Sequence, residues 1–218
     1  DRVVAAGVEA RWLLGCDGLH STVARRSGLA LPSRRGPRRF GIRRHYALEP
    51  WSDLIEVIYA SEVEFYVTPV GDREVGVAML GPMGSRFDLA LAAVPSLVER
   101  LAGASVSSSL RGAGPFRSRT KARTSGRILL VGDAAGYVDA LTGEGLRLGF
   151  ALARAAVQAV ASGRPADYED SWRRETRAFR TLTTGVVTWA TSPARRLLVP
   201  TAARVPTLFG AAVDRLAR

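Results

Sequence analysis

The spacing of apolar and polar residues changes along the chain. Residues 8–16 form one apolar run, residues 40–80 alternate between apolar and polar side chains, and residues 146–161 are apolar at helical spacing. Alternation is typical of strands buried on one face, whereas a repeat of three to four residues is typical of helices. The pattern therefore predicts strands and helices in separate segments of the chain.

The first segment predicts a buried strand followed by a short helix. The apolar run over residues 8–16 stops at Asp17-Gly18, a pair that favours a turn. Ser21 is suited to cap the helix that follows, and Gly28 is suited to end it. Cys16, the last residue of the run, is predicted to be a buried and unreactive thiol.

The middle segment predicts an antiparallel sheet with strands over residues 40–48, 54–60, 63–69 and 74–80. In the third strand, alternation separates an apolar face from a polar one. The apolar face carries Val63, Phe65 and Val67, and the polar face carries Glu64, Tyr66 and Thr68. We expect one face to pack and the other to be free to meet a ligand.

The remaining pattern predicts mainly helices. Residues 89–101 read as one helix despite Pro95, and residues 146–161 as a helix that is packed deeply around most of its circumference. An amphipathic helix is expected over residues 167–190, and two shorter helices around Pro193 and Pro206.

Composition excludes several classes of protein. The 218 residues are 47% hydrophobic and 23% charged, which excludes a disordered chain. No integral membrane segment is expected, because Arg147, Arg154 and Gln158 interrupt the richest apolar stretch. A single cysteine allows neither an intramolecular disulfide nor a multi-cysteine zinc site, and no metal site is expected. The single cysteine and the absence of a leader with basic and then apolar residues together favour a cytoplasmic location.

The chain is strongly basic, with a formal net charge of +11. Its arginines are spread widely, so the excess is explained most simply by a GC-rich coding sequence, and no nucleic acid is expected as a partner. One dense cluster consists of Arg34, Arg35, Arg38, Arg39, Arg43 and Arg44. It leaves open a rival from another class, a non-catalytic protein that binds anions or nucleic acid.

Candidate chemistry concentrates where the predicted strand over residues 127–131 runs into Gly132-Asp133-Ala134-Ala135-Gly136. An aspartate at a strand end can accept hydrogen bonds from ligand hydroxyls, and the small residues after it let the backbone approach a ligand. Gly143 and Gly145 expose N–H groups at the start of the next helix, where negative charge is favoured. An isolated aspartate could equally be a turn cap, but the whole run is more specific.

Residues 131–146 resemble the second FAD signature of the FAD-dependent monooxygenases of the aromatic-hydroxylase type, whose relatives include geranylgeranyl reductases and flavin-dependent halogenases. The resemblance implies that Asp133 binds the ribityl chain of FAD. The other residues that it places beside the cofactor are Gly132, Ala134, Ala135, Gly143, Glu144, Gly145 and Leu146.

Residues 12–25 resemble the Asp-Gly motif that serves both FAD and the pyridine nucleotide in the same family. The resemblance assigns cofactor binding to Asp17, Gly18 and Ser21. Ala24 stands where many members have an arginine, so that role passes to Arg25 or is absent.

By this resemblance the fold is α+β or α/β, the C-terminal part of an FAD-binding Rossmann-like domain with an inserted antiparallel sheet and C-terminal helices. Residues 1–35 are expected to form part of the FAD-binding domain, residues 36–115 the substrate domain, residues 116–163 the rest of the FAD-binding domain, and residues 164–218 the terminal helices. No Gly-x-Gly-x-x-Gly turn precedes Asp17. We therefore expect this chain alone to be an incomplete and inactive piece of the enzyme.

The function implied by the resemblance is that of an NAD(P)H-dependent monooxygenase that uses molecular oxygen on a small hydrophobic, aromatic or polyketide-like substrate. Tyr59, Phe65 and Tyr66 are candidates to line its pocket. Gly136 and Ala140 replace the His and Pro of many aromatic hydroxylases. This departure keeps open a flavin-dependent reductase of prenyl double bonds. No catalytic residue is identified, and the oligomeric state stays open.

Overall fold

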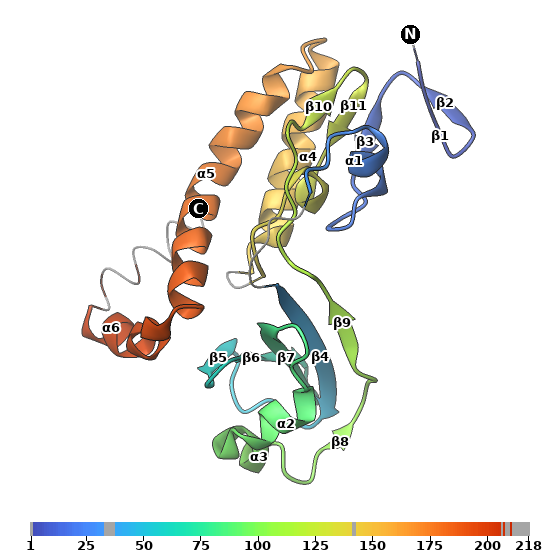
Figure 1. Cartoon of the computed structure of the whole chain (residues 1–218). Helices are drawn as coiled ribbons and strands as arrows, with labels where there is room; N and C mark the ends of the chain where they lie inside the picture. The colour runs from blue at the N-terminus through green and yellow to red at the C-terminus, as the bar shows by residue number, and fades with distance from the viewer. Residues whose placement is uncertain (1, 33–37, 141–142, 206, 208–209, 211–218) are drawn as a thin grey trace. The chain divides into compact units, whose positions relative to one another are not determined.

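The computed structural model describes residues 2–32, 38–140, 143–205, 207 and 210. The chain forms two compact units (Figure 1): unit 1 comprises Asp1–Arg34 and Arg117–Arg218, and unit 2 comprises Arg35–Phe116. Unit 2 is thus an insertion in the sequence of unit 1. The mixture of helices with antiparallel sheets confirms the predicted fold class. The four-part division of the sequence into domains stays a prediction.

Unit 1 contains two small sheets. β1 (Val3–Ala5) and β2 (Val8–Ala10) form a hairpin, and β10 (Thr124–Ser125), β11 (Ile128–Leu130) and β3 (Leu13–Gly15) form the other sheet in that order. The prediction of one strand over residues 8–16 was wrong. The turn at Ala6 and Gly7, both with positive φ, pairs β2 with β1, whereas β3 pairs with β11.

The helices of unit 1 follow the predictions closely. α1 (Thr22–Arg26) begins after Ser21, whose Oγ accepts a hydrogen bond from the Ala24 N–H at 2.8 Å. α4 (Gly145–Ala161) and α5 (Asp167–Ala190) pack side by side, and the short helices η2 (Pro193–Leu197) and α6 (Leu198–Arg204) follow. Pro206, where the last helix was predicted, lies outside the described residues.

The core of unit 1 lies between the second sheet, the 3-10 helix η1 (Gly132–Ala135), α4 and α5. The hydroxyl of the fully buried Tyr168 donates a hydrogen bond of 2.8 Å to the Leu130 carbonyl, which ties α5 to β11. The prediction of a deeply packed helix over residues 146–161 was wrong on one side. Leu146 and Phe150 are 79% and 74% exposed, because only the opposite side of α4 faces η1 and α5.

Unit 2 is built on one antiparallel sheet with the order β5-β6-β7-β4-β8, and β9 also pairs with β4. The strands are β4 (Arg39–Ala47), β5 (Glu56–Tyr59), β6 (Glu64–Gly71), β7 (Glu74–Pro82), β8 (Ser105–Val106) and β9 (Arg111–Ala113). Val63, Phe65 and Val67 are buried together with Val77 and Met79, so the predicted alternation of faces is confirmed.

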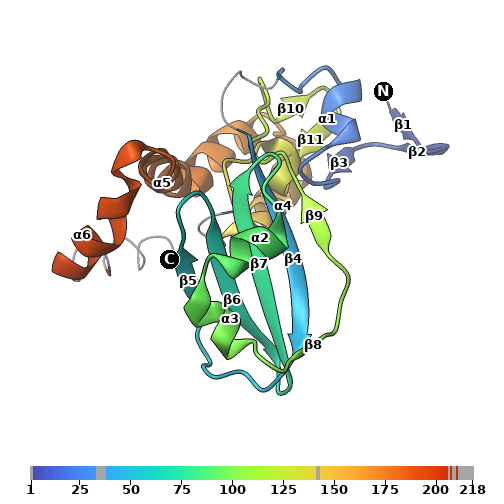
Figure 2. The same cartoon turned by 60° about the horizontal axis from the view of Figure 1, so that its bottom comes forward.

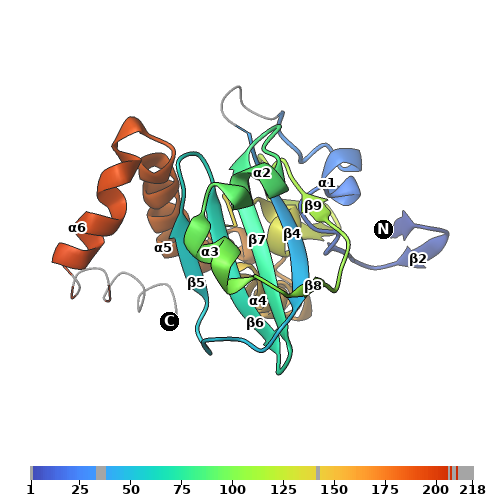
Figure 3. The same ribbon diagram turned by 90° about the horizontal axis from the view of Figure 1, so that it is seen from below.

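Two short helices, α2 (Phe87–Ala92) and α3 (Pro95–Arg100), cover this apolar face (Figures 2 and 3). The prediction of one helix over residues 89–101 was wrong. Proline disfavours helical conformation in the residue before it and is accepted in a first helical turn. Val94 accordingly leaves the helical region, with φ −122° and ψ 79°, and Pro95 opens α3.

None of the helices in the described parts of the chain combines the length and apolar character that crossing a bilayer would require.

Candidate cofactor-binding site

The two predicted motifs meet at one edge of the second sheet of unit 1. β3 and β11 are parallel, with Leu13 opposite Ile128 and Gly15 opposite Leu130. The Val131 N–H donates to the Gly15 carbonyl at 2.9 Å, which extends this pairing beyond the strand ends. Because parallel strands end at the same edge, Asp17 and Asp133 both follow carboxyl ends there, where open α/β sheets bind ligands.

Asp133 lies in η1, directly after β11. Its side chain is half-buried, and this burial raises the pKa of the carboxyl above its ordinary value. Its carboxylate has no hydrogen bond or ion pair with any residue that the structure describes, although its backbone carbonyl accepts from the Ser118 hydroxyl at 3.3 Å. The half-buried carboxylate therefore keeps acceptor capacity that no described residue uses, and it is suited to receive donors from a ligand.

Small residues bring the backbone of η1 close to α4. Ala134 and Ala135 are buried in the core beside Leu152 and Ala156 of α4. The Thr120 hydroxyl holds the segment in place by donating to the Ala135 carbonyl at 2.7 Å. Any larger side chain at positions 134 or 135 would have to displace α4.

No side chain of a described residue caps the N-terminus of α4. Glu144 occupies the N-cap position, but its carboxylate pairs with the Arg147 guanidinium instead of the helix N–H groups. The first turn carries no acidic residue, and Leu146 is exposed there. Gly143 has φ +70°, a conformation that glycine adopts readily, while Leu141 and Thr142 lie outside the described residues. The helix end therefore presents N–H groups that suit a negative or carbonyl-bearing edge of a ligand.

The Asp-Gly motif caps α1 in this structure. The Asp17 carboxylate accepts hydrogen bonds from the Ser21 hydroxyl at 2.5 Å and from the N–H groups of Thr22 and Val23 at 2.6 and 3.0 Å. These contacts cap α1. Gly18 has φ +74°, and the Arg25 guanidinium folds back onto the His20 carbonyl and the Thr22 hydroxyl. Contact of these residues with a cofactor stays a prediction.

We expect Asp17→Ala to lower the free energy of unfolding by about 0.5–2 kcal/mol near pH 7, the usual cost of losing a helix cap. Partial burial acts to raise the pKa of Asp17, but hydrogen bonds from Ser21, Val23 and Thr22 outweigh it and lower that pKa. The stabilisation is therefore present above the unfolded pKa of about 3.9 and is lost as pH falls through the folded pKa. Urea unfolding of both proteins at pH 7 measures the loss of unfolding free energy, and the same experiment at pH 3 measures how that loss depends on ionisation of Asp17. An equal loss at the two pH values would contradict the capping role.

Cys16 is exposed, so the prediction of a buried thiol was wrong. It follows the last paired residue of β3 and lies at the open edge of the sheet rather than in its core. Among the residues that the structure describes, no group of three His, Cys, Asp or Glu side chains is arranged to hold a metal ion.

The candidate pocket residues of unit 2 lie on two different faces of its sheet. Tyr66 is on the face opposite to the helices, and Tyr59 pairs with Glu64 on that same face. Phe65 is completely buried on the helix-covered face, where its ring packs edge-on against the Phe87 ring with the two ring centroids 6.0 Å apart. Tyr59 and Tyr66 can therefore share a ligand surface, and Phe65 cannot join them.

Unit 2 also contains a cavity of about 360 Å³ that the sequence analysis missed. Its walls come from β4, the end of β7 and β9, and it is lined by Phe40, Gly41, Ile42, Met79, Pro82, Met83, Ser85 and residues 112–114. The glycines at 41 and 114 are its signal in the sequence, because they let aromatic rings approach the backbone: a Cβ at these positions would lie 3.0 Å from the Phe116 ring and 2.7 Å from the Phe40 ring. The volume is in the range of small-molecule sites.

Comparison with known proteins settles the family. A family model described as an FAD binding domain matches residues 4–163, which is most of the chain. The chain belongs to this FAD binding domain family. The match covers both motifs and unit 2, so FAD is the cofactor that the residues of this site are expected to meet. No curated protein sequence matches the chain.

Solved structures with the same fold include several flavoenzymes. The chain superposes with a TM-score of 0.68 on CmlS, a flavin-dependent halogenase, at 19% identity over 84% of this chain and 37% of that one. The flavin-dependent brominase Bmp2 gives a TM-score of 0.67 at 19% identity, over 97% of this chain and 59% of Bmp2. OxyS anhydrotetracycline hydroxylase from Streptomyces rimosus gives a TM-score of 0.59 at 21% identity, over 95% of this chain and 45% of OxyS. The chain thus spans well under two thirds of each protein.

The residues present at the edge of the FAD binding domain fit the sugar and ring portion of FAD. Among the described residues, the Asp133 carboxylate has no partner and no side chain caps the α4 N-terminus, so the two supply an acceptor and donors to a ligand. A Cβ built on Gly143 or Gly145 meets no heavy atom within 4 Å, so the backbone there is open to a ligand. These features match the hydroxyls of the ribityl chain and the electron-rich edge of the flavin.

We expect Gly145→Ala to weaken FAD binding at least about tenfold while leaving the fold intact. The added methyl group meets no protein atom within 4 Å, and alanine favours helix by up to about 1 kcal/mol over glycine. Gly149→Ala is the matched control, because it makes the same change in the same helix and also meets nothing within 4 Å. Fluorescence titration with FAD measures the affinities. Equal affinities for both variants would remove the α4 N-terminus from the site.

Proposed function

We propose that this chain is the ribityl- and ring-binding part of an FAD-dependent monooxygenase that uses NAD(P)H and molecular oxygen to hydroxylate a small hydrophobic substrate. The observation that carries the proposal is the half-buried Asp133 carboxylate, which has no partner among the described residues and lies at a strand end in an FAD binding domain. Such a group has acceptor capacity that the hydroxyls of a ligand can use.

The chain's own residues bind and orient the cofactor. FAD supplies the redox chemistry when it is bound. Asp133 fixes the ribityl chain through charge-assisted hydrogen bonds, and the N–H groups at Gly145 favour negative charge at the adjacent edge of the ring. Neither role requires a proton transfer by these residues. The Glu144 carboxylate is held by Arg147, so it is a turn residue and not a general base.

The substrate is proposed to be small and apolar, with aromatic and polyketide-like compounds as the first candidates. The apolar cavity of unit 2 supports this size and chemistry, and Tyr59 and Tyr66 provide aromatic rings on the sheet face opposite to α2 and α3. OxyS, whose name describes a hydroxylase of anhydrotetracycline, has the same fold and supports a polyketide-like substrate. Phe65 belongs to the core and is left out of this surface.

Oxygen consumption tests the proposal directly. In the complete protein loaded with FAD, NAD(P)H and a productive substrate should together cause uptake of one oxygen molecule per product formed. Reduction of a prenyl double bond without oxygen uptake would replace the monooxygenase with the flavin-dependent reductase. Absence of bound FAD from the purified protein, together with no spectral change on titration with FAD, would overturn both.

A further inference from the structure

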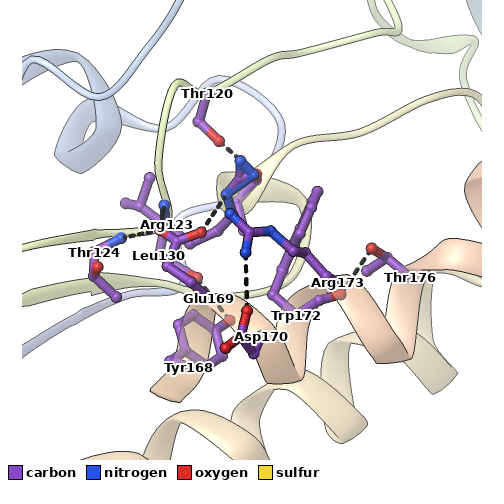
Figure 4. A network of polar contacts seen from close by, with 11 residues as sticks. Thr120, Arg123, Thr124, Leu130, Tyr168, Glu169, Asp170, Trp172, Arg173 and Thr176 are labelled. Carbon is purple, nitrogen blue, oxygen red and sulfur yellow. Dashed lines mark hydrogen bonds and ion pairs between the residues drawn. The ribbon is translucent and has the colours of Figure 1, made fainter. Parts of the chain in front are cut away.

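Four arginines of unit 1 lie close enough for their charges to interact, and two of them contact a tryptophan of α5. Arg117, Arg119 and Arg123 come from the extended segment before β10, and Arg180 comes from α5. We call these four residues the arginine cluster. Figure 4 shows Arg123 of this cluster, whose guanidinium lies over the Trp172 ring, 3.9 Å from the ring centroid. Arg180 approaches the same ring at 5.0 Å.

Side chains of the segment before β10 divide between η1 and α5. Ser118 and Thr120 donate to carbonyls of η1, and Ala122 packs on the core. Arg119 lies between Ser118 and Thr120, so in extended backbone its side chain points the other way. Together with Arg117 and Arg123, it acts on the charge of Arg180 in α5.

The arginine cluster lacks matching negative charge. Glu169 neutralises only Arg123, at 3.5 Å from its Nε, and also accepts from the Thr124 N–H. The other three arginines have no ion pair with a residue that the structure describes. Burial and the charges of Arg123, Arg119 and Arg117 lower the pKa of Arg180, and no carboxylate offsets them.

A second observation points to a missing acceptor at the same place. Trp172 is 6% exposed, and its buried Nε1–H finds no hydrogen-bond acceptor in the part of the chain that the structure describes. An unpaired indole donor beside unpaired guanidinium groups is the arrangement that an anionic oxygen would satisfy.

We propose that the arginine cluster binds the phosphate or diphosphate group of a small ligand, on the side of unit 1 where Arg180 also lines a small pocket together with Asp133. Guanidinium forks match phosphate oxygens in pairs, and the Trp172 ring holds two of them in place before binding. A compact anion fits better than a nucleic acid, because α5 carries four acidic and four basic residues and therefore offers no net positive charge along the helix to a polyanion.

Calorimetric titration of the complete protein with pyrophosphate and with inorganic phosphate tests the site. Arg180→Gln and Arg119→Gln should each weaken pyrophosphate binding at least about tenfold, and Arg180→Lys should restore it only in part. Arg174→Gln is the matched control: it removes the same charge from the same helix, and Arg174 contacts only the Ser171 hydroxyl. It should bind like the unchanged protein. Circular dichroism checks that each variant is folded, and the two variants on separate elements guard against loss of structure at one of them.

Competition identifies the source of the phosphate. Displacement of pyrophosphate by NADPH but not by NADH assigns the site to the additional phosphate of that nucleotide, and displacement by neither assigns it to another phosphorylated small molecule. Equal weakening in Arg174→Gln, or tighter binding of duplex DNA than of pyrophosphate, would show a non-specific basic surface and overturn the proposal. Absence of pyrophosphate binding by folded, unchanged protein would overturn it as well.

Discussion

Asp133→Ala is expected to weaken FAD binding by about 10- to 100-fold, because it removes charge-assisted hydrogen bonds that contribute about 1.5–3 kcal/mol. The free energy of unfolding without cofactor should stay the same or rise, since the lost carboxylate is half-buried and has no partner among the described residues. This opposite response of affinity and stability separates a ligand-binding residue from a structural one. Titration with FAD and urea unfolding of the apoprotein measure the two quantities.

A pH series sharpens this prediction. Burial raises the pKa of Asp133, so the carboxylate begins to protonate at a higher pH than the ordinary value of about 3.9. Protonation removes the charged acceptor, and FAD affinity should therefore fall as the solution becomes acidic. Asp133→Asn keeps the shape and should lack this pH dependence. Asp167→Ala, which removes an exposed carboxylate paired with Arg164, is the control. Stoichiometric FAD retained by Asp133→Ala after dialysis would contradict the assignment.

Glu64→Gln is expected to lower the free energy of unfolding by about 3–5 kcal/mol, the usual cost of removing one partner from a buried ion pair. Glu64 of β6 and Arg39 of β4 form such a pair across β7, and their side chains are only 2% and 7% exposed. The change leaves a buried guanidinium facing a neutral group. Urea unfolding followed by circular dichroism measures the loss.

The paired substitution separates charge from packing. Arg39→Met combined with Glu64→Leu removes both charges at similar volume, and such replacements are often neutral or stabilising. The double variant should therefore be more stable than Glu64→Gln alone. A loss below about 1 kcal/mol in Glu64→Gln would show that Arg39 and Glu64 are solvated in solution.

Much of the secondary structure could be predicted from the sequence because it depends on local chemistry. The limits of α5, Asp167–Ala190, agree with the prediction, and Ser21 caps α1 as expected. These features depend on residue spacing and on side chains that satisfy nearby N–H groups. The faces of β6 were predicted for the same reason, since alternation alone separates Phe65 from Tyr66.

The predictions were wrong where the burial of a residue depends on contacts with residues distant in the sequence. Cys16 ends an apolar run, yet it is exposed because β3 stops at Gly15 and its partner β11 continues into η1. α4 is apolar around most of its surface, but only the side that meets η1 and α5 is buried. The sequence pattern shows how hydrophobic a residue is, but its burial depends on the residues that pack against it.

The Gly-Asp motif, the sheet of unit 2 and the helices after it follow from the amino-acid sequence alone, because residue spacing and small side chains carry that information locally. Folding was needed to show that Asp17 caps α1 while the Asp133 carboxylate has no partner among the described residues. Folding also brings Arg123 and Arg180 onto the ring of Trp172. Charge and hydrogen-bond balance depend on distances between groups, and residues separated by tens of positions acquire those distances only when the chain folds.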